Sequence, residues 1–227
     1  MITLKQEKII KKLLSKKGRQ TTGLCLVEGK KNLEAAKNFL EFSFTVQDTK
    51  NFKKLLSVQT PQPIAGVAKI PQNNLSDLLK RKVIVLLDGV QDPGNVGAIL
   101  RLCLGFKAAL VLIESADPSS PKVIRSSAGA FFAVPWLEIK REEAEETIKK
   151  INRLTYRLEA KPKAEFFNDR LLKKFSQETL LIAGSEGEGI KLKTKAPSLM
   201  IKHEKELESL NVAQALTIVL ARLYNKE

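Results

Sequence analysis

The sequence predicts an α/β fold in which a parallel sheet forms the larger part. Continuous apolar runs occur at residues 83–87, 109–113 and 179–183. The runs do not alternate with polar residues, and strands of this kind are buried on both faces, as in parallel sheets. Helical patterns separate the runs, as expected where crossover helices connect parallel strands. We therefore expect residues 83 onward to form a sheet that helices cover on both faces.

Four helices are expected in this part of the chain, near residues 95–104, 121–132, 141–154 and 209–224. The last of them is apolar on nearly every side, with Val212, Leu216 and Leu220 among its residues. A helix of this composition is buried within its domain or against a partner subunit.

The first third of the chain has a different pattern. Over residues 5–17, apolar residues share one helical face and lysines cover the rest. An apolar run, a second amphipathic helix and a strand preceded by a turn follow, at residues 24–29, 31–40 and 64–70. We predict two domains, a small α/β domain over residues 1–76 and a larger domain over residues 77–227.

Charge is distributed unevenly between these parts. The chain has 39 Lys and Arg against 25 Asp and Glu, a formal net charge of +14. Residues 1–81 hold 16 basic and 6 acidic residues, a net charge of +10. Such a segment favours a polyanionic partner, because lysines near phosphates release condensed counterions. A well-solvated, lysine-rich surface is the alternative explanation.

Cysteine usage and hydropathy indicate a cytoplasmic protein. Cys25 and Cys103 lie in apolar stretches, so buried thiols in a reducing compartment are expected. His203, the one histidine, is interpreted as a solvated surface residue, and no metal site is expected. Lysines interrupt the N-terminus too often for a signal peptide, and no apolar run approaches the ~20 residues that cross a bilayer.

The first segment that carries chemistry is LDGVQDPGNVGAILR, residues 87–101. A predicted strand ends at Asp88, and a glycine-containing loop leads to a helix for which Asn95 is the expected N-cap. Arg101 follows six residues later, so both side chains could face the loop. Ligands in such folds lie beyond the carboxyl ends of the strands, where this loop is placed. The structural alternative is an ordinary strand-to-helix turn with a surface arginine.

The second segment is AGSEGEGI, residues 183–190, after the predicted strand at 179–183. Its glycines permit a backbone that wraps a ligand, although a glycine-rich loop alone is a weak signal. A dinucleotide site needs a helix directly after the loop. The lysine-rich residues 191–196 and Pro197 follow instead, and the phosphate-loop pattern is absent from the sequence. A Rossmann or phosphate-loop nucleotide site is therefore disfavoured.

The third segment is ESLNVAQAL, residues 208–216. Ser209 stands where a helix cap is expected, and Asn211 is polar at the start of an otherwise apolar helix. Both residues could serve only as caps. They could also hold a substrate next to the glycine loop.

These three segments, in this order, resemble the three signature motifs of the SpoU/TrmH family of SPOUT methyltransferases. Residues 122–135 also resemble a segment of that family, and the basic first third resembles the ribosomal-protein-like substrate-binding domain of many members. The resemblance implies a parallel sheet with a C-terminal trefoil knot, and a homodimer. It also implies methyl transfer from S-adenosylmethionine to a ribose 2′-hydroxyl of RNA, with large-subunit ribosomal RNA favoured over transfer RNA.

The resemblance also assigns site residues. Those that correspond to the cofactor pocket are Gly184, Gly187, Gly189, Ile201 and Leu210. Those that correspond to the catalytic group are Asn95, Arg101, Glu186, Ser209 and Asn211, and Arg101 is implied to act across the subunit interface.

The chain departs from the family pattern at Lys202, where members usually have proline, and at Leu102 and Cys103, where Thr-Ala is common. Lys202 and the unusually charged residues 203–207 bear on the geometry of the cofactor loop, whereas the change at Leu102 and Cys103 is mild. Two alternatives stay open: an RNA-binding or ribosome-assembly factor with this fold but without methyl transfer, and a methyltransferase that acts on a base.

Overall fold

A computed structural model of the chain describes residues 1–161, 164–168, 171–172, 178–204 and 206–225. Contacts divide the chain into two compact units. The first comprises Met1–Gln72 and Asp117–Ala133, and the second comprises Asn73–Ala116 and Val134–Glu227. Each unit is described by itself below.

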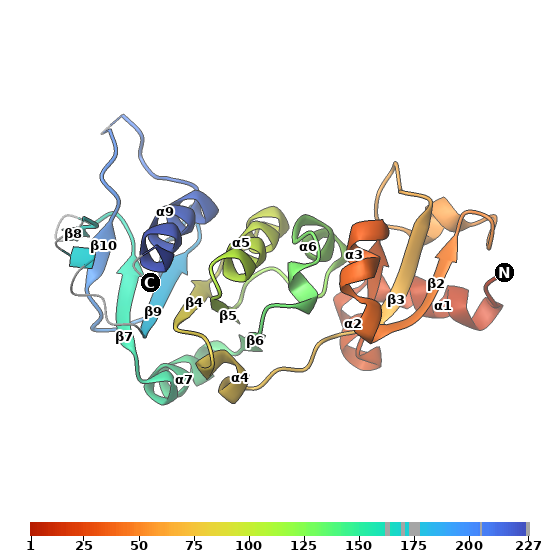
Figure 1. Cartoon of the computed structure of the whole chain (residues 1–227), viewed down its shortest axis with the longest axis horizontal. Helices are drawn as coiled ribbons and strands as arrows, with labels where there is room; N and C mark the ends of the chain where they lie inside the picture. The colour runs from red at the N-terminus through yellow and green to blue at the C-terminus, as the bar shows by residue number, and fades with distance from the viewer. Residues whose placement is uncertain (162–163, 169–170, 173–177, 205, 226–227) are drawn as a thin grey trace. The chain divides into compact units, whose positions relative to one another are not determined.

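The second unit is built on a seven-stranded sheet in which all described pairings are parallel (Figure 1). The strand order is β6-β5-β4-β9-β7-β10-β8. The strands are β4 (Val83–Asp88), β5 (Ala109–Ile113), β6 (Trp136–Ile139), β7 (Leu154–Leu158), β8 (Glu165–Phe166), β9 (Thr179–Gly184) and β10 (Ser198–Met200). The predicted parallel sheet is confirmed, with the three apolar runs as the adjacent strands β5, β4 and β9.

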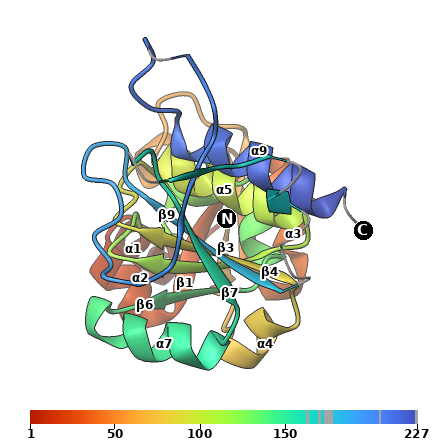
Figure 2. The same cartoon turned by 90° about the vertical axis from the view of Figure 1, so that its left-hand side faces the viewer.

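Helices cover both faces of this sheet (Figure 2). One face carries α5 (Pro93–Gly105) and α9 (Val212–Tyr224), and the other carries α4 (Leu75–Leu79) and α7 (Ala144–Ile151). On the α4/α7 side, Leu78 and Ile151 pack against strand residues such as Ile84 and Ile182. The buried face of α9 explains its apolar sequence, because Val212, Ala213, Ala215, Leu216, Val219 and Leu220 are buried.

The two helices beside the sheet's carboxyl edge begin at other residues than predicted. Asp92 caps α5, and its carboxylate accepts a hydrogen bond from the Asn95 backbone amide at 2.8 Å. The expectation that Asn95 is the N-cap is therefore wrong. Asn211 caps α9 through hydrogen bonds from the Ala213 and Gln214 amides, so Ser209 lies outside the helix. The side chain of Asn95 is thereby free to bond elsewhere.

The first unit contains a three-stranded antiparallel sheet in the order β1-β3-β2. Its elements are α1 (Leu4–Leu13), α2 (Lys16–Thr22), β1 (Leu24–Glu28), α3 (Lys30–Ala35), η1 (Lys37–Phe39), β2 (Leu40–Thr45), η2 (Phe52–Leu55), β3 (Ile64–Lys69), α6 (Pro121–Ser126) and η3 (Ala130–Phe132). Its core includes Ile10, Leu13, Leu26, Phe44 and Phe52. The single helix predicted over residues 5–17 is two helices, because Ser15 caps the second. The helix predicted over residues 31–40 ends early, because Leu40 begins β2.

Residues 117–133, which leave the second unit after β5, pack into the first unit. The buried Arg19 donates to Asp117 and, at 3.2 Å, to the Ser119 hydroxyl. Arg125 donates to the buried Glu28. The helix predicted over residues 121–132 is divided: α6 ends at Ser126, and Gly129, whose φ of +95° suits glycine, precedes η3. A functional division after residue 76 remains a prediction.

Both cysteines are buried and unpaired, as predicted. Burial raises the pKa of each thiol to about 12, because the thiolate form is the one that loses solvation. Among the described residues, no helix has the length and apolarity to cross a membrane. The described residues also contain no cluster of three or more metal-ligating side chains.

Candidate functional site

Three segments that are distant in sequence meet at the carboxyl edge of the large sheet. Strands β4 and β9 are neighbours in the sheet, and Asp88, the last residue of β4, pairs with Gly184, the last of β9. The loop after β4 enters α5, and the loop after β9 carries the glycine-rich segment. Asn211, the residue before α9, is hydrogen-bonded to Asn95 on α5 and to Glu186 in the glycine-rich segment. The site is thus assembled from the three segments that the sequence singled out.

Asn95, Glu186 and Asn211 form a closed hydrogen-bonded network. The side-chain amide of Asn95 donates to Glu186 Oε1 at 3.1 Å, and the side-chain amide of Asn211 donates to the same oxygen at 2.6 Å. The Asn211 amide also donates to Asn95 Oδ1 at 3.0 Å. Each amide is oriented by the other and by one carboxylate, so the three side chains are positioned before any ligand binds. The structure thereby brings together three of the five predicted catalytic residues.

Arg101 and Ser209 lie outside this network. Ser209 is exposed and lines the adjoining cavity. Arg101 is exposed on α5, and within the described part of the chain it has no hydrogen-bond or ion-pair partner. The expectation that Asn95 and Arg101 face the same side is not met. Six residues are about 1.7 helical turns, so the two side chains leave α5 in different directions.

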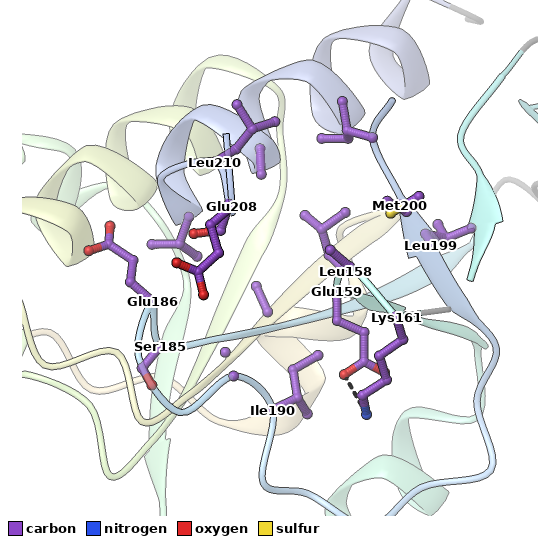
Figure 3. A pocket seen from close by; sticks show the side chains of 18 of the residues that line it. Leu158, Glu159, Lys161, Ser185, Glu186, Ile190, Leu199, Met200, Glu208 and Leu210 are labelled. Carbon is purple, nitrogen blue, oxygen red and sulfur yellow. Dashed lines mark ion pairs between the residues drawn. The ribbon is translucent and has the colours of Figure 1, made fainter. Parts of the chain in front are cut away.

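Beside the network is a cavity of about 430 Å³ (Figure 3). Its walls include all five residues predicted for the cofactor pocket: Gly184, Gly187, Gly189, Ile201 and Leu210. Apolar side chains supply much of the remaining wall, among them Leu158, Ile190, Leu199 and Met200. Glu186 belongs both to the network and to the cavity wall, so the two features are continuous.

Glycine is required at position 184 by a close backbone approach. A Cβ atom there would lie 2.1 Å from the carbonyl carbon and oxygen of Gly189 and 2.5 Å from the Ile190 nitrogen. The loop folds back on itself through a hydrogen bond from the Gly189 amide to the Ser185 carbonyl at 3.0 Å. The glycines therefore shape the cavity by allowing the backbone to double back.

An ion pair that sequence reasoning missed stands in the cavity wall. Lys161 Nζ lies 3.0 Å from Glu159 Oε2 (Figure 3). Burial raises the pKa of Glu159, but hydrogen bonds from Arg157, Ser198 and Lys161 outweigh it and hold the pKa at about 2. Glu159 follows β7, a strand that was not predicted because polar residues interrupt it. A short β-rich run, LTYRL, was the available signal.

His203 is also placed differently from the prediction. It is half-buried and lines the cavity, and its Nδ1 lies 2.7 Å from the Ile201 carbonyl oxygen. The interpretation of His203 as a solvated surface residue is therefore wrong. The contact between Nδ1 and the Ile201 carbonyl holds the ring beside the cavity. Lys202, the departure from the family pattern, is exposed and is not among the cavity-lining residues.

Comparison with known proteins places the chain among RNA methyltransferases. Residues 82–221 match the SpoU rRNA Methylase family. An uncharacterized tRNA/rRNA methyltransferase of Synechocystis sp. is 28% identical, with 96% of this chain and 91% of the relative covered. The 23S rRNA (guanosine(2553)-2′-O)-methyltransferase RlmP of Bacillus subtilis is 29% identical, with 76% of this chain and 68% of the relative covered.

A solved structure shows the same fold. The AdoMet-bound rRNA methyltransferase from Sinorhizobium meliloti has a TM-score of 0.86 and 23% identity, and the match covers 100% of this chain and 97% of that one. The family match alone spans more than half of the sequence. The chain therefore belongs to the SpoU rRNA methylase family.

Proposed function

We propose that this protein transfers a methyl group from S-adenosylmethionine to a ribose 2′-hydroxyl of RNA, with large-subunit ribosomal RNA as the substrate. The observation that carries the proposal is the continuity between the cavity and the Asn95–Glu186–Asn211 network. A cofactor in the cavity would lie next to polar side chains that are already oriented. Family membership supports the same reaction.

The cavity suits S-adenosylmethionine. Its volume of about 430 Å³ falls within the range of small-molecule sites. The apolar wall, with Ile190, Leu199 and Leu210, would hold the adenine ring, and the backbone of the glycine loop offers polar groups. The Glu186 and Glu208 carboxylates in the wall would favour a positively charged ligand (Figure 3). When bound, the cofactor supplies an activated methyl group on its sulfonium.

The protein's own residues would position and activate the hydroxyl. A ribose 2′-hydroxyl is a poor nucleophile until its proton is withdrawn or its oxyanion is stabilised. Asn95 and Asn211 would orient the ribose, and Glu186 would hold both amides in place. Guanidinium groups stay protonated in proteins and are poor bases. Arg101 would therefore bind the phosphate of the target nucleotide and lower the pKa of its hydroxyl through positive charge.

We further propose that Arg101 reaches the site from a second copy of the chain. Arg101 has no partner within the described residues, although its family counterpart belongs to the catalytic group. Leu104, one turn further along α5, and Ile218 on α9 are 48% and 41% exposed, respectively. A homodimer formed through these helices would cover apolar surface and bring Arg101 to the partner's network. The trefoil knot implied by the family remains a prediction.

The substrate is proposed from charge and from the relatives. The net charge of +10 in residues 1–81 fits contact with RNA phosphates. RlmP is named for a 2′-O-methylation of 23S rRNA, whereas the Synechocystis relative is named for tRNA or rRNA. Transfer RNA is thus the alternative substrate. Methylation of ribosomal RNA by this protein would take place in the cytoplasm.

The test is transfer of labelled methyl from S-adenosylmethionine to unmodified ribosomal and transfer RNA, followed by digestion to nucleosides and mass spectrometry. A 2′-O-methylnucleoside from ribosomal RNA is expected. A methylated base would replace the ribose assignment, and label in transfer RNA alone would replace the substrate. Binding of RNA without cofactor binding or transfer would show a factor that kept the fold without the chemistry.

A further inference from the structure

Asp88 is a fully buried carboxylate for which the proposed reaction has no use. It is the last residue of β4, and its backbone pairs with Gly184 at the start of the glycine loop. Its Oδ2 accepts hydrogen bonds from the Lys191 amide at 2.6 Å and the Leu192 amide at 2.7 Å. One residue thus holds both ends of the loop, at Gly184 through the strand and at 191–192 through the side chain.

Arg157 on β7 binds the same segment through its backbone carbonyls, whereas Asp88 binds the backbone amides. It is 7% exposed, and its Nη1 donates to the Leu192 carbonyl at 2.6 Å while Nη2 donates to the Ile190 carbonyl at 3.4 Å. Its Nε donates to Glu159 Oε1 at 2.8 Å. Arg157 therefore links the end of the glycine loop to Glu159, an acidic side chain in the cavity wall.

We propose that Asp88 and Arg157 are positioning residues that hold residues 190–192 as a two-sided clasp and thereby preform the cofactor cavity. The clasp is defined by the Asp88 carboxylate on the backbone amides and the Arg157 guanidinium on the carbonyls. The inference rests on the proposed function, since it assigns the cavity to a cofactor. Neither side chain lines the cavity itself. Asp88 acts through the backbone of residues 191–192, and Arg157 acts through Ile190 and Glu159, which do line it.

Two features of the loop and of the segment after it favour a clasp over a general structural role. Residues 190–192 belong to no helix or strand, so their buried polar groups need partners from side chains. The loop before them contains Gly187 and Gly189, and glycine loses more conformational entropy on ordering than any other residue. A loop that is ordered in advance spares the ligand that cost, which raises affinity.

Arg141 offers a matched comparison, because it bridges two carboxylates of which only one reaches the loop. Its Nη2 donates to Asp88 Oδ1 at 2.8 Å and to Glu114 Oε2 at 2.6 Å. The Glu114 side chain is exposed and is hydrogen-bonded to Arg141; its charge interacts with that of Lys191, but within the described part of the chain it forms no hydrogen bond with residues 190–192. Glu114→Gln therefore weakens the Arg141 ion pair and leaves every hydrogen bond of the clasp in place.

The experiment measures binding of S-adenosylhomocysteine by calorimetry, together with amide hydrogen exchange at Lys191 and Leu192, in the full chain. Asp88→Asn presents an NH₂ group or a single neutral oxygen to two amides. We expect its Kd to rise about 10-fold or more, and exchange at both amides to accelerate. KM for S-adenosylmethionine should rise more than kcat falls. Glu114→Gln should bind as the wild type does.

Arg157→Lys keeps the positive charge but cannot donate to both carbonyls and to Glu159 at once, so a smaller rise in Kd is expected. If Asp88→Asn does not fold, this variant carries the same test. Folded variants with wild-type Kd and wild-type exchange would overturn the clasp. Failure of the wild type to bind S-adenosylhomocysteine would instead overturn the proposed function, and exchange at the two amides would still decide whether the clasp exists.

Discussion

Two residues of the same helix, Asn95 and Arg101, are in opposite situations. Asn95 is half-buried in the first turns of α5 and is bonded to Glu186 and Asn211. Arg101 is exposed, and within the described residues it has no polar partner. The resemblance to the family placed both in one catalytic group. In the structure, Asn95 is joined to Glu186 and Asn211, and Arg101 lies apart from them.

The fold of one chain thus positions the amides and the carboxylate, and it leaves the guanidinium in solvent. Neutral amides and one carboxylate can be held together within a chain at little cost in desolvation. A guanidinium held unpaired inside the site would be costly, because a buried charge needs a partner. An arginine that stays in solvent until RNA or a second subunit arrives avoids that cost.

Removing Arg101 should have the largest effect on activity. Arg101→Ala is expected to lower the rate of methyl transfer by about 100-fold or more, because the positive charge that binds the target phosphate would be lost. Arg101→Lys should recover little, since lysine cannot bind a phosphate in the bidentate manner. Thermal unfolding should be unchanged for both, because the side chain is exposed. Near-wild-type turnover of Arg101→Lys would exclude bidentate recognition.

Asn211 allows the network to be separated from helix capping. Its side-chain oxygen caps α9, while its NH₂ group donates to Asn95 and Glu186. Asn211→Ser should keep the cap and lose the donor, so transfer falls about 10-fold while stability is retained. Asn211→Ala should lose both, with about 1 kcal/mol less stability as measured by urea unfolding. Equal activity of Asn211→Ser and the wild type would refute the orienting role.

Glu159 should make part of the stability dependent on acid. Its pKa in the folded chain is about 2, below its ordinary value of 4.5. The stabilisation is therefore present above the unfolded value and is lost as the pH falls from about 5 toward 2. In Glu159→Gln, melting followed by circular dichroism should show lower stability at pH 7 and a smaller loss on acidification. Parallel acid profiles for the two proteins would contradict this assignment.

Treatment of the buried Cys103 on α5 with a thiol reagent should have the smallest effect. Cys103 is fully buried there, and burial raises its pKa to about 12. Iodoacetamide at neutral pH should leave the folded protein unmodified and fully active, whereas unfolding in urea should expose the thiol to reaction. Mass spectrometry reads out the modification. Rapid alkylation of native Cys103 would show that α5 opens more readily than its packing indicates.

The sequence predicted those parts of the fold that are uniform in polarity. The apolar runs correspond to β4, β5 and β9, but β7 contains Arg157 and was not predicted. The polarity of β7 makes sense only once Arg157 binds the Ile190 and Leu192 carbonyls, more than 30 residues away in the chain. Similarly, nothing near Asp88 in sequence indicates that its carboxylate holds amides 103 and 104 residues later.

The sequence was likewise able to predict only part of the site. Family motifs supplied Asn95, Glu186 and Asn211 as candidates, and the structure joins them. The sequence could not show that Asp92, rather than Asn95, caps α5, because both residue types cap well. It also could not place His203, whose ring is held by its contact with the Ile201 carbonyl after β10.

The central claim is that the catalytic group is divided between two chains. Arg101→Ala and Asn211→Ser chains with different tags would be co-expressed, and mixed dimers would be purified through both tags. One site of such a dimer would combine an intact network with the partner's Arg101, so about half of wild-type methyl transfer is predicted, although each variant alone is impaired. Mixed dimers as inactive as their parents would show that Arg101 acts within its own chain and would contradict the account.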